Sequence, residues 1–332
     1  MIKFVIKRLV SMVLILLSLT AIIFILQRIS GVSPAHAYLG GSASQQAIAH
    51  ETHILGYDKP LIAQYIHYVS GLLSGNLEVS LRTRHPVSAD IASFLPATAE
   101  LAITGLIFAV LLGAAFGLLS AARFRGAGVF RLLLMSFASA PVFLLALLAV
   151  LLVSGKFHLL PSTGDSGYFN APTGPTGMIV VDGLLHGEWA VAWDGVRHLL
   201  LPAIVVALGP AVSIGRVLRG SLEASMQTDF VRTARAKGLK EHTIVVRHAL
   251  RNSLSAALSM TGLQVGLMFA GVVVVETIFA WPGIGLYVDQ SIPQADFPAI
   301  AGVTLVLGMA YVVINAVVDV LQALIDPRVT LE

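Results

Sequence analysis

The chain has 332 residues, of which 56% are hydrophobic and only 12% are charged. Soluble domains carry about 25% charged residues, so this composition excludes a water-soluble globular protein and indicates an integral membrane protein. The formal net charge is +3 and cysteine is absent, which excludes disulfides, thiol catalysis and cysteine metal sites.

Six apolar segments are long enough to cross a membrane, which requires roughly 20 residues in a helix. In chain order they are Leu9–Leu26, Leu101–Ala122, Leu132–Val153, Leu199–Val217, Leu254–Phe279 and Ile300–Ile325. The fourth contains Pro202 and Gly209-Pro210, which are tolerated where neighbouring helices satisfy the freed backbone groups. The sequence therefore predicts an all-α membrane protein with six transmembrane helices.

The first apolar segment has two interpretations. Basic residues precede it, and residues 35–37 (Ala-His-Ala) resemble a signal-peptidase cleavage site. The apolar core of a cleaved signal is about 7–15 residues long. Leu9–Leu26 is longer, so we expect this segment to remain in the protein as a membrane span.

The distribution of lysine and arginine predicts the orientation, because these residues concentrate on the cytoplasmic side. With the N-terminus inside, the cytoplasmic segments hold 15 of the 21 Lys and Arg residues. This bias predicts a multi-pass protein with both termini in the cytoplasm. The expected organisation is an N-terminal transmembrane helix in residues 1–30, a periplasmic segment in residues 31–98, and a transmembrane domain with helices 2–6 in residues 99–332.

Two segments then lie on the outer side. Residues 31–98 contain two short amphipathic helices, Gln45–Leu55 and Leu61–Leu73, separated by Gly56 and Pro60. We expect them to form a small cap. Residues 154–197 are rich in Gly, Pro, Thr and Asp, and they predict a loop with little regular structure.

The segment DFVRTARAKGLKEHTIVVRHALRN, residues 229–252, is unusually basic and lies between the fourth and fifth spans. Ser221 is expected to cap a first helix, which Gly238 ends in a left-handed conformation. A second helix is expected to start near Lys240 and to continue into the fifth span. The apolar face of the first helix comprises residues spaced by four: Leu218, Leu222, Met226, Phe230 and Ala234.

Three interpretations of this basic segment compete. A solvated loop that only fixes the topology is the simplest. Ala234, Gly238 and Ile244 have the spacing of a helix-turn-helix motif, but only about 30 residues lie between the spans, and DNA-binding domains of this kind need further helices. We favour the third interpretation, in which the segment is a docking element to which a cytoplasmic protein binds. A helix pair that is fixed at both ends by membrane spans is stiff, so it can transmit a displacement.

The segment resembles the EAA loop of ABC-importer permeases, in the form found in dipeptide/oligopeptide permease subunits. Arg232-Thr233-Ala234 stands where the general pattern has Glu-Ala-Ala, and Gly238 is the fixed glycine. The RTARAKGL and HALRN blocks resemble the peptide-permease variant more closely than the general form. Further blocks with the same resemblance are LGYDKPLIAQYIHYVSGLLSGNLEVS (55–80), ETIFAWPGIG (276–285) and NAVVDVLQALIDPRV (315–329), whereas Ser33-Pro34 and Asn76 depart from the subfamily's pattern.

The resemblance implies a type I ABC-importer permease (MetI-like) fold in the bacterial cytoplasmic (inner) membrane, with a small periplasmic insertion between helices 1 and 2. It implies one half of a translocation path for di- or oligopeptides, with a nickel complex or glutathione as the alternative solute. The implied partners are a second homologous permease subunit, two ATP-binding cassette ATPase subunits and a solute-binding protein. The chain has no G-x-x-x-x-G-K-[ST] motif, so we expect no cofactor here and ATP and Mg on the partner subunits.

The expected site residues fall into two groups, and neither is catalytic. The resemblance places ATPase coupling in residues 218–252, at Phe230, Arg232, Thr233, Ala234, Arg235, Lys237 and Gly238. Polar groups within spans are costly and often functional, which makes Gln264, Glu276 and Asn315 candidates for the translocation path. Interhelical hydrogen bonds would explain Gln264 and Asn315 equally well.

Two other classes of membrane protein find less support in the sequence. An intramembrane enzyme is disfavoured because the chain has no His-Glu-x-x-His motif and no paired aspartates within its spans. The histidines of the outer segment have irregular spacing, so we expect no metal site. An ion-coupled secondary transporter often shows internal repeats, and none is evident at this length.

Overall fold

The computed structural model describes residues 2–29, 39, 44–54, 56, 58–121, 126–168 and 174–325. Within these ranges the regular elements are helical, apart from one isolated β-bridge between Val79 and Pro86. Five helices there are long and apolar enough to cross a membrane: Val10–Ile29, Val87–Ser120, Trp189–Ser225, Glu241–Phe279 and Phe297–Val317. The prediction of an all-α membrane protein is confirmed, and residues 35–37 lie outside the described ranges.

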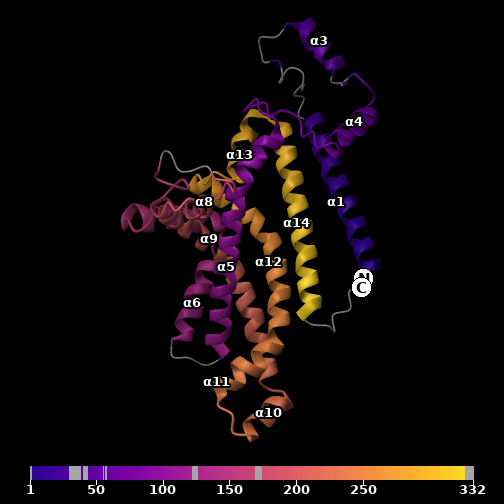
Figure 1. The fold of residues 1–332 in the computed structure, drawn as a ribbon. Coiled ribbons are helices and arrows are strands. Elements are labelled where there is room, and N and C mark those ends of the chain that lie inside the picture. The colour runs from indigo at the N-terminus through magenta and orange to yellow at the C-terminus, as the bar shows by residue number, and fades with distance from the viewer. Residues whose placement is uncertain are drawn as a thin grey trace. The chain divides into compact units, whose positions relative to one another are not determined.

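The chain divides into two compact units. The first comprises Met1–Leu95 and Tyr287–Ala310, and the second comprises Pro96–Leu286 and Tyr311–Glu332. Three helices, labelled in Figure 1, contribute residues to both units. They are α5, which spans Val87–Ala121, α13, which spans Ile284–Ser291, and α14, which spans Phe297–Ile325.

The first unit contains the two predicted outer helices. They are α3 (Gln45–Ile54) and α4 (Leu61–Leu73), and Pro60 occupies the N-cap position of α4. Helix α4 packs on α1 (Ile2–Ile29), where the hydroxyls of Thr20 and Tyr65 lie 2.9 Å apart and the Phe24 ring meets Tyr65 edge-on. Two short amphipathic helices were predicted here, and both are present.

Two buried carboxylates fix the turn that joins α4 to α5 within the first unit. Asp90 on α5 accepts a hydrogen bond from the hydroxyl of Tyr287 at 2.9 Å, and Tyr287 lies on α13 (Ile284–Ser291). Asp296, which follows the short 3-10 helix η3 (Ile292–Gln294), accepts from the Ser80 hydroxyl at 2.5 Å and from the Arg82 amide at 3.1 Å. Buried polar groups that are fully paired in this way hold a turn in one conformation. This network was not predicted from the sequence.

The third predicted span is not one continuous helix. Residues 132–153 fall on α6 (Ala127–Ala138), α7 (Val142–Ala149) and the π-helical η1 (Val150–Lys156). The break lies at residues 139–141, where Pro141 adopts an extended conformation (ψ 143°) as the N-cap of α7. Proline offers no N–H and disfavours the helical conformation in the residue before it, so a single helix through this point was the wrong expectation.

Residues 154–197, which were predicted to form an outer loop, are more ordered than their composition predicts. This segment contains α8 (Ile179–Leu185), and α9 begins at Trp189 and runs to Ser225. A Cβ atom at Gly183 would lie 2.9 Å from the backbone nitrogen of Ala192, so only glycine lets the two helices come this close. The prediction of an irregular loop was wrong from residue 179 onward, because the segment gains its order by packing on itself.

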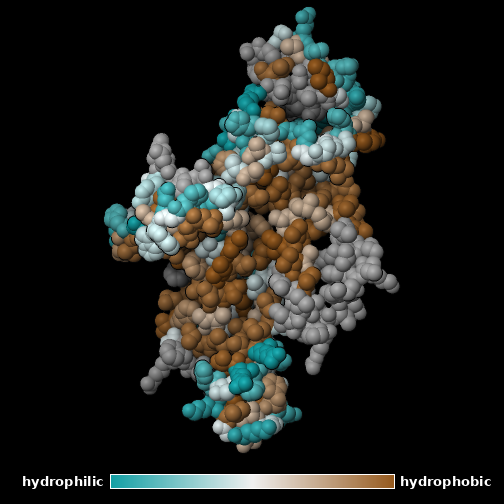
Figure 2. Space-filling view, in the orientation of Figure 1, coloured by the Kyte–Doolittle hydropathy of each residue, from teal (hydrophilic) through white to brown (hydrophobic). Residues whose placement is uncertain are grey.

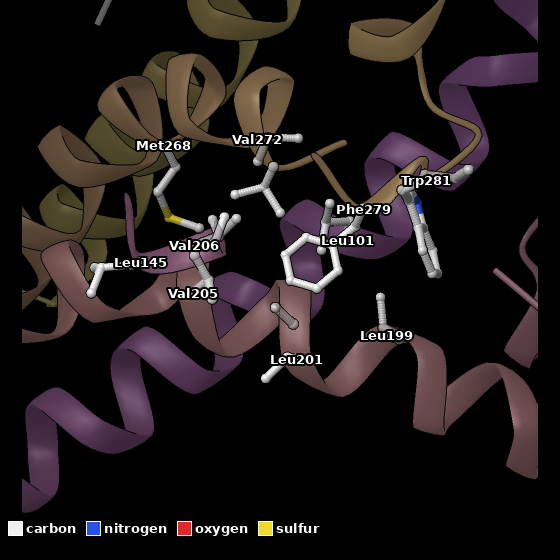
Figure 3. Packing of buried hydrophobic residues seen from close by; sticks show 14 residues of the cluster. Leu101, Leu145, Leu199, Leu201, Val205, Val206, Met268, Val272, Phe279 and Trp281 are labelled. Carbon is white, nitrogen blue, oxygen red and sulfur yellow. The ribbon is translucent and has the colours of Figure 1, made fainter. Parts of the chain in front are cut away.

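The core of the second unit lies between α5, α9 and α12 (Leu250–Phe279). Figure 3 shows Leu101 of α5, Leu199 of α9 and Phe279 of α12 near the indole ring of Trp281. Toward the other end, α5 and α9 approach closely at glycines. A Cβ atom at Gly113 would lie 2.9 Å from the Ala211 carbonyl oxygen, and one at Gly117 would lie 2.8 Å from the Leu218 side chain. Small residues permit such close approach of membrane helices.

Candidate functional site

The coupling segment, residues 218–252, begins inside α9 rather than at a new helix. Ser221 lies within α9, so it is not the predicted cap. The next helix, α10, spans Asp229–Ala236, and its N-cap is Thr228, in an extended conformation. The Thr228 hydroxyl donates to the Ser225 carbonyl at 2.5 Å, which satisfies one of the last carbonyls of α9 and sets the angle of the turn.

Gly238 ends α10 as predicted, with a φ of +77°. Its N–H donates to the Arg235 carbonyl at 2.9 Å, and the N–H of Leu239 donates to the Ala234 carbonyl at 3.3 Å. This pair of hydrogen bonds is the Schellman motif, in which a left-handed residue satisfies the open carbonyls of a helix end. The chain then re-enters a helix at α11 (Glu241–Thr243), which continues through the π-helical η2 (Ile244–Ala249) into α12.

The interior of the coupling segment is a small apolar cluster. Val231 and Ala234 from α10 pack against Ile244 of η2, with Met226 at the edge, and Val231 and Ile244 are fully buried. Ala234 therefore faces the interior of its own chain, which corrects the expectation that it packs on a partner. The predicted apolar face contained only residues spaced by four and therefore did not include Val231. Residues spaced by three, such as Val231 and Ala234, also lie on one face of a helix.

Ion pairs join some of the charged residues of the coupling segment to one another. The guanidinium of Arg235 binds Glu241 through two contacts, Nε–Oε1 at 2.6 Å and Nη2–Oε2 at 3.3 Å, across the glycine turn. These hydrogen bonds raise the pKa of Arg235. Arg232 reaches Asp229 at 3.2 Å. Lys237 has no such partner in the described part of the chain, so its ammonium group is available to another protein.

Apolar side chains also reach the surface of the coupling segment. Phe230 is 43% exposed and Leu239 is 39% exposed. In Figure 2 the tip formed by α10 and α11 is largely hydrophilic, with hydrophobic residues between the polar ones. The Thr233 hydroxyl donates to the Asp229 carbonyl at 3.0 Å within α10. An exposed aromatic ring surrounded by charge is typical of a protein-docking surface.

The base of the coupling segment is firmly joined to the membrane helices. Leu218 and Leu222 of α9 form a buried cluster with Ala249 of η2 and Ala257 of α12. Buried hydroxyls of α9 and α12, on residues 225 and 253, lie 3.2 Å apart. A displacement of α10 is therefore transmitted to both α9 and α12 through packed, hydrogen-bonded contacts.

Glu276 does not line a path, contrary to the expectation from the sequence. Its side chain is fully buried near the end of α12, and Oε2 accepts a hydrogen bond from the Gly285 amide at 2.6 Å. The carboxylate thus caps the N-terminus of α13, where negative charge is favourable. A Cβ atom at Gly283 would collide with this carboxylate, which explains the glycine there.

Gln264 lines an open groove of about 420 Å³ in the second unit. The groove lies between the break that separates α6 from α7, the Gly209-Pro210 step of α9, and one face of α12. Figure 3 shows part of its wall, where Leu145, Val206 and Met268 come from three different helices. The Gln264 amide contacts the sulfur of Met260 at 3.6 Å, a weak bond that leaves the amide free for other partners.

Asn315 is not part of this groove. Its side-chain nitrogen donates to the Tyr311 carbonyl one turn earlier on α14, at 2.8 Å, and the residue is partly buried. The structure therefore does not bring the three path candidates together, because Gln264 alone among them lines the groove.

The chain matches two family models that together account for most of its length. The model described as "Binding-protein-dependent transport system inner membrane component" matches residues 109–331. The model of the N-terminal part of such membrane components matches residues 1–102.

Curated proteins align with the chain over nearly its whole length. It is 37% identical to the probable D,D-dipeptide transport system permease protein DdpB of Escherichia coli, over 96% of this chain and 95% of that protein. It is 35% identical to the dipeptide transport system permease protein DppB of Alkalihalophilus pseudofirmus, over 99% of each chain. It is 36% identical to the di/tripeptide transport system permease protein DppB of Pseudomonas aeruginosa, again over 99% of each.

Proposed function

This chain belongs to the family of binding-protein-dependent transport system inner membrane components, and we propose that it forms half of the path by which di- or oligopeptides cross the bacterial cytoplasmic membrane. It is a permease component of an ABC transporter and not an enzyme. The names of relatives that cover the whole chain support peptides as the cargo. A nickel complex or glutathione is the alternative solute.

The proposed assembly follows from what this chain lacks. Its sequence has no P-loop, so the energy of ATP has to come from partners, which we take to be two ATPase subunits that hold ATP and Mg. A second, similar permease subunit would complete the path, and a solute-binding protein would deliver the peptide on the outer side. Both termini are proposed to lie in the cytoplasm, on the strength of the lysine and arginine distribution.

The observation that supports this proposal most directly is the way in which the coupling segment is packed. The apolar cluster of Val231, Ala234 and Ile244 and the Arg235–Glu241 ion pair hold α10 and α11 as one compact knob. Phe230 and Lys237 are left on its surface. A knob of this kind fits a groove of a cytoplasmic partner, with the ring as its apolar contact and the ammonium group facing acidic or polar groups.

The mechanism we infer is a rigid-body switch. Closure of the ATPase pair on ATP displaces the two docked coupling segments, one on each permease subunit. The contacts at the base pass the displacement to α9 and α12, which both line the groove. Rotation of packed elements between two arrangements is an established way of switching access. The walls of the groove therefore move when the ATPase does.

Co-purification with the partner subunits, followed by a peptide screen for stimulated ATPase activity in proteoliposomes, tests the proposal. We expect an ATPase to be recovered, and di- or oligopeptides delivered by the binding protein to stimulate it. Failure to recover any ATPase would contradict the assignment. Uptake that continues without ATP and follows an ion gradient would instead favour a secondary transporter, and stimulation only by nickel complexes or glutathione would change the solute.

A further inference from the structure

The groove beside Gln264 carries a positive charge on one wall. Arg216 lines it, on the same face of α9 as Ser213 and Gly209. These residues are spaced by three and four, so one stripe of the helix faces the groove. The opposite wall, on α12, presents residues 264, 267, 268 and 271 with the same periodicity. The groove is thus bordered by two helix faces, and its polar groups are concentrated on them.

Arg216 is exposed and has no ion-pair partner in the described part of the chain. It also lies one residue before the end of the predicted fourth span, 199–217, on the side predicted to be cytoplasmic. An unpaired cation near the end of a span faces water or a ligand, and its position on the groove wall makes it a functional candidate. Arg219, one turn further along α9, differs because it is paired with Glu223 at 2.8 Å. Of these two arginines, Arg216 on the groove wall is therefore the one that is free to bind a ligand.

The backbone adds acceptors to the same groove. Pro210 has no N–H, so the carbonyl of Val206 receives no hydrogen bond from the residue four positions on, and both residues line the groove. The Ser213 hydroxyl lies 3.3 Å from the Gly209 carbonyl, at the outer limit of a hydrogen bond. Together with the Gln264 amide, these groups offer both donors and acceptors along an otherwise apolar surface.

From this arrangement we propose that Arg216 binds the carboxylate of a peptide as it passes through the groove. Arginine binds carboxylates in a planar, two-point geometry. The size is suitable, since ligand sites occupy about 300–1,000 Å³ and the groove holds about 420 Å³. From Val205 to Arg216 the wall extends about 16 Å along the helix, which accommodates an extended peptide of about four residues.

A transport site has to release what it binds. Conduction requires binding that is favourable enough for entry and weak enough for exit. One exposed arginine in an open groove, next to neutral hydrogen-bonding groups, meets this requirement better than a buried ion-binding cage. Arg216 thus selects for a free carboxylate while allowing side chains of different size to pass. The inference rests on the proposed peptide cargo, and it assigns a residue to the recognition of that cargo.

The first test compares a dipeptide with its C-terminal amide in proteoliposomes that contain the complete transporter. We expect R216Q to lower uptake of the free acid about tenfold, which corresponds to the loss of one charged contact, and to change uptake of the amide less than twofold. R216K keeps the charge and should retain part of the preference. R197Q removes an exposed arginine of the same helix outside the groove, and both uptakes should stay at the wild-type level.

The solute-binding protein can itself prefer the acid over the amide. This preference cancels when the variant is compared with the wild type, because the same binding protein delivers the peptide to both. If R216Q carries acid and amide as the wild type does, the proposed role of Arg216 is wrong while the peptide function stands. If the wild-type transporter carries no peptide at all, the proposed function fails instead.

The second test does not depend on the cargo and uses the absence of cysteine from the natural chain. A single cysteine replaces Ser213, one turn from Arg216, and reacts with an anionic or a cationic water-soluble methanethiosulfonate in the assembled transporter. We expect the anionic reagent to react about tenfold faster, because of the neighbouring positive charge, and R216Q to remove this preference. L263C is the control, on α12 beside Gln264 but outside the groove.

Two results of the labelling experiment would overturn the proposal. One is a Ser213→Cys variant that reacts with neither reagent, because the groove would then not be open to water. The other is an anionic preference that persists without Arg216, because the attraction would then come from another group.

Discussion

Replacement of Gly238 tests how the coupling segment works, and the structure makes the expected effect specific. A Cβ atom at this position would meet nothing within 4 Å, so the size of a new side chain is not limiting inside the chain. The backbone is limiting, since a φ of +77° costs an L-residue about 1–2 kcal/mol. Asparagine adopts this conformation more readily than other residues, and a β-branched residue adopts it least readily.

The expected order of activity is therefore glycine, asparagine, alanine, valine. A cost of about 1–2 kcal/mol changes an equilibrium by a factor of about 5–30. We expect Gly238→Val to lower peptide-stimulated ATPase activity and uptake about fivefold or more, and Gly238→Asn to stay within about twofold. Gly220→Val is the matched control, because Gly220 also has open space around its Cβ position but lies within the right-handed helix α9.

Membrane insertion and amount of each variant are measured in the same preparations, so that loss of protein is not mistaken for loss of coupling. Normal uptake by Gly238→Val would refute the view that the left-handed turn sets the shape of the docking knob. Equal loss in the asparagine and valine variants would also refute it. That result would show that a partner protein contacts this position directly and rejects any side chain.

Three further predictions concern neighbouring residues. Phe230→Ala should weaken co-purification of the ATPase with unchanged thermal stability, because the ring is exposed, whereas Val231→Ala should destabilise the buried cluster by about 1–3 kcal/mol and increase proteolysis of the segment. Glu241→Arg alone should reduce stimulated ATPase activity by placing two cations together, and the exchange with Arg235→Glu should restore it; no recovery in the double variant would argue against the ion pair. Trp281→Phe should lower the melting temperature of the purified complex, because the indole N–H donates at 2.8 Å to a buried carbonyl of α5, a loss of about 1–3 kcal/mol; an unchanged melting temperature would contradict this.

The sequence was most informative where a single residue type dictates the local conformation. Runs of about 20 apolar residues predict spans because the bilayer imposes their length. Gly238 predicts a helix end because few other residues adopt the left-handed conformation. Both predictions depend on local chemistry alone. The helix end at Gly238 agrees with the structure, and so do the predicted spans apart from the third, which is broken at residues 139–141.

The sequence was least informative where the neighbours of a residue decide its role. Glu276 was expected to line a path because it is an acid near a span, but its amide partner at Gly285 makes it a helix cap. Phe230 and Val231 are adjacent apolar residues, and Val231 is the buried one because it packs in the cluster that contains Ile244. The effect of Pro141 was predictable from its lack of an N–H, but the apolar run around it concealed the break.

The coupling segment and the groove are connected without a relay of side chains. Arg216 lies nine residues before the end of α9, about 14 Å along the helix, and Gln264 lies about 21 Å along α12 from Leu250. Both distances lie within uninterrupted helices. Packed rigid elements with two arrangements are sufficient to carry coupling between sites. A displacement applied at Phe230 therefore reaches both walls of the groove together, so the proposed carboxylate contact at Arg216 can be formed and released in step with the ATPase.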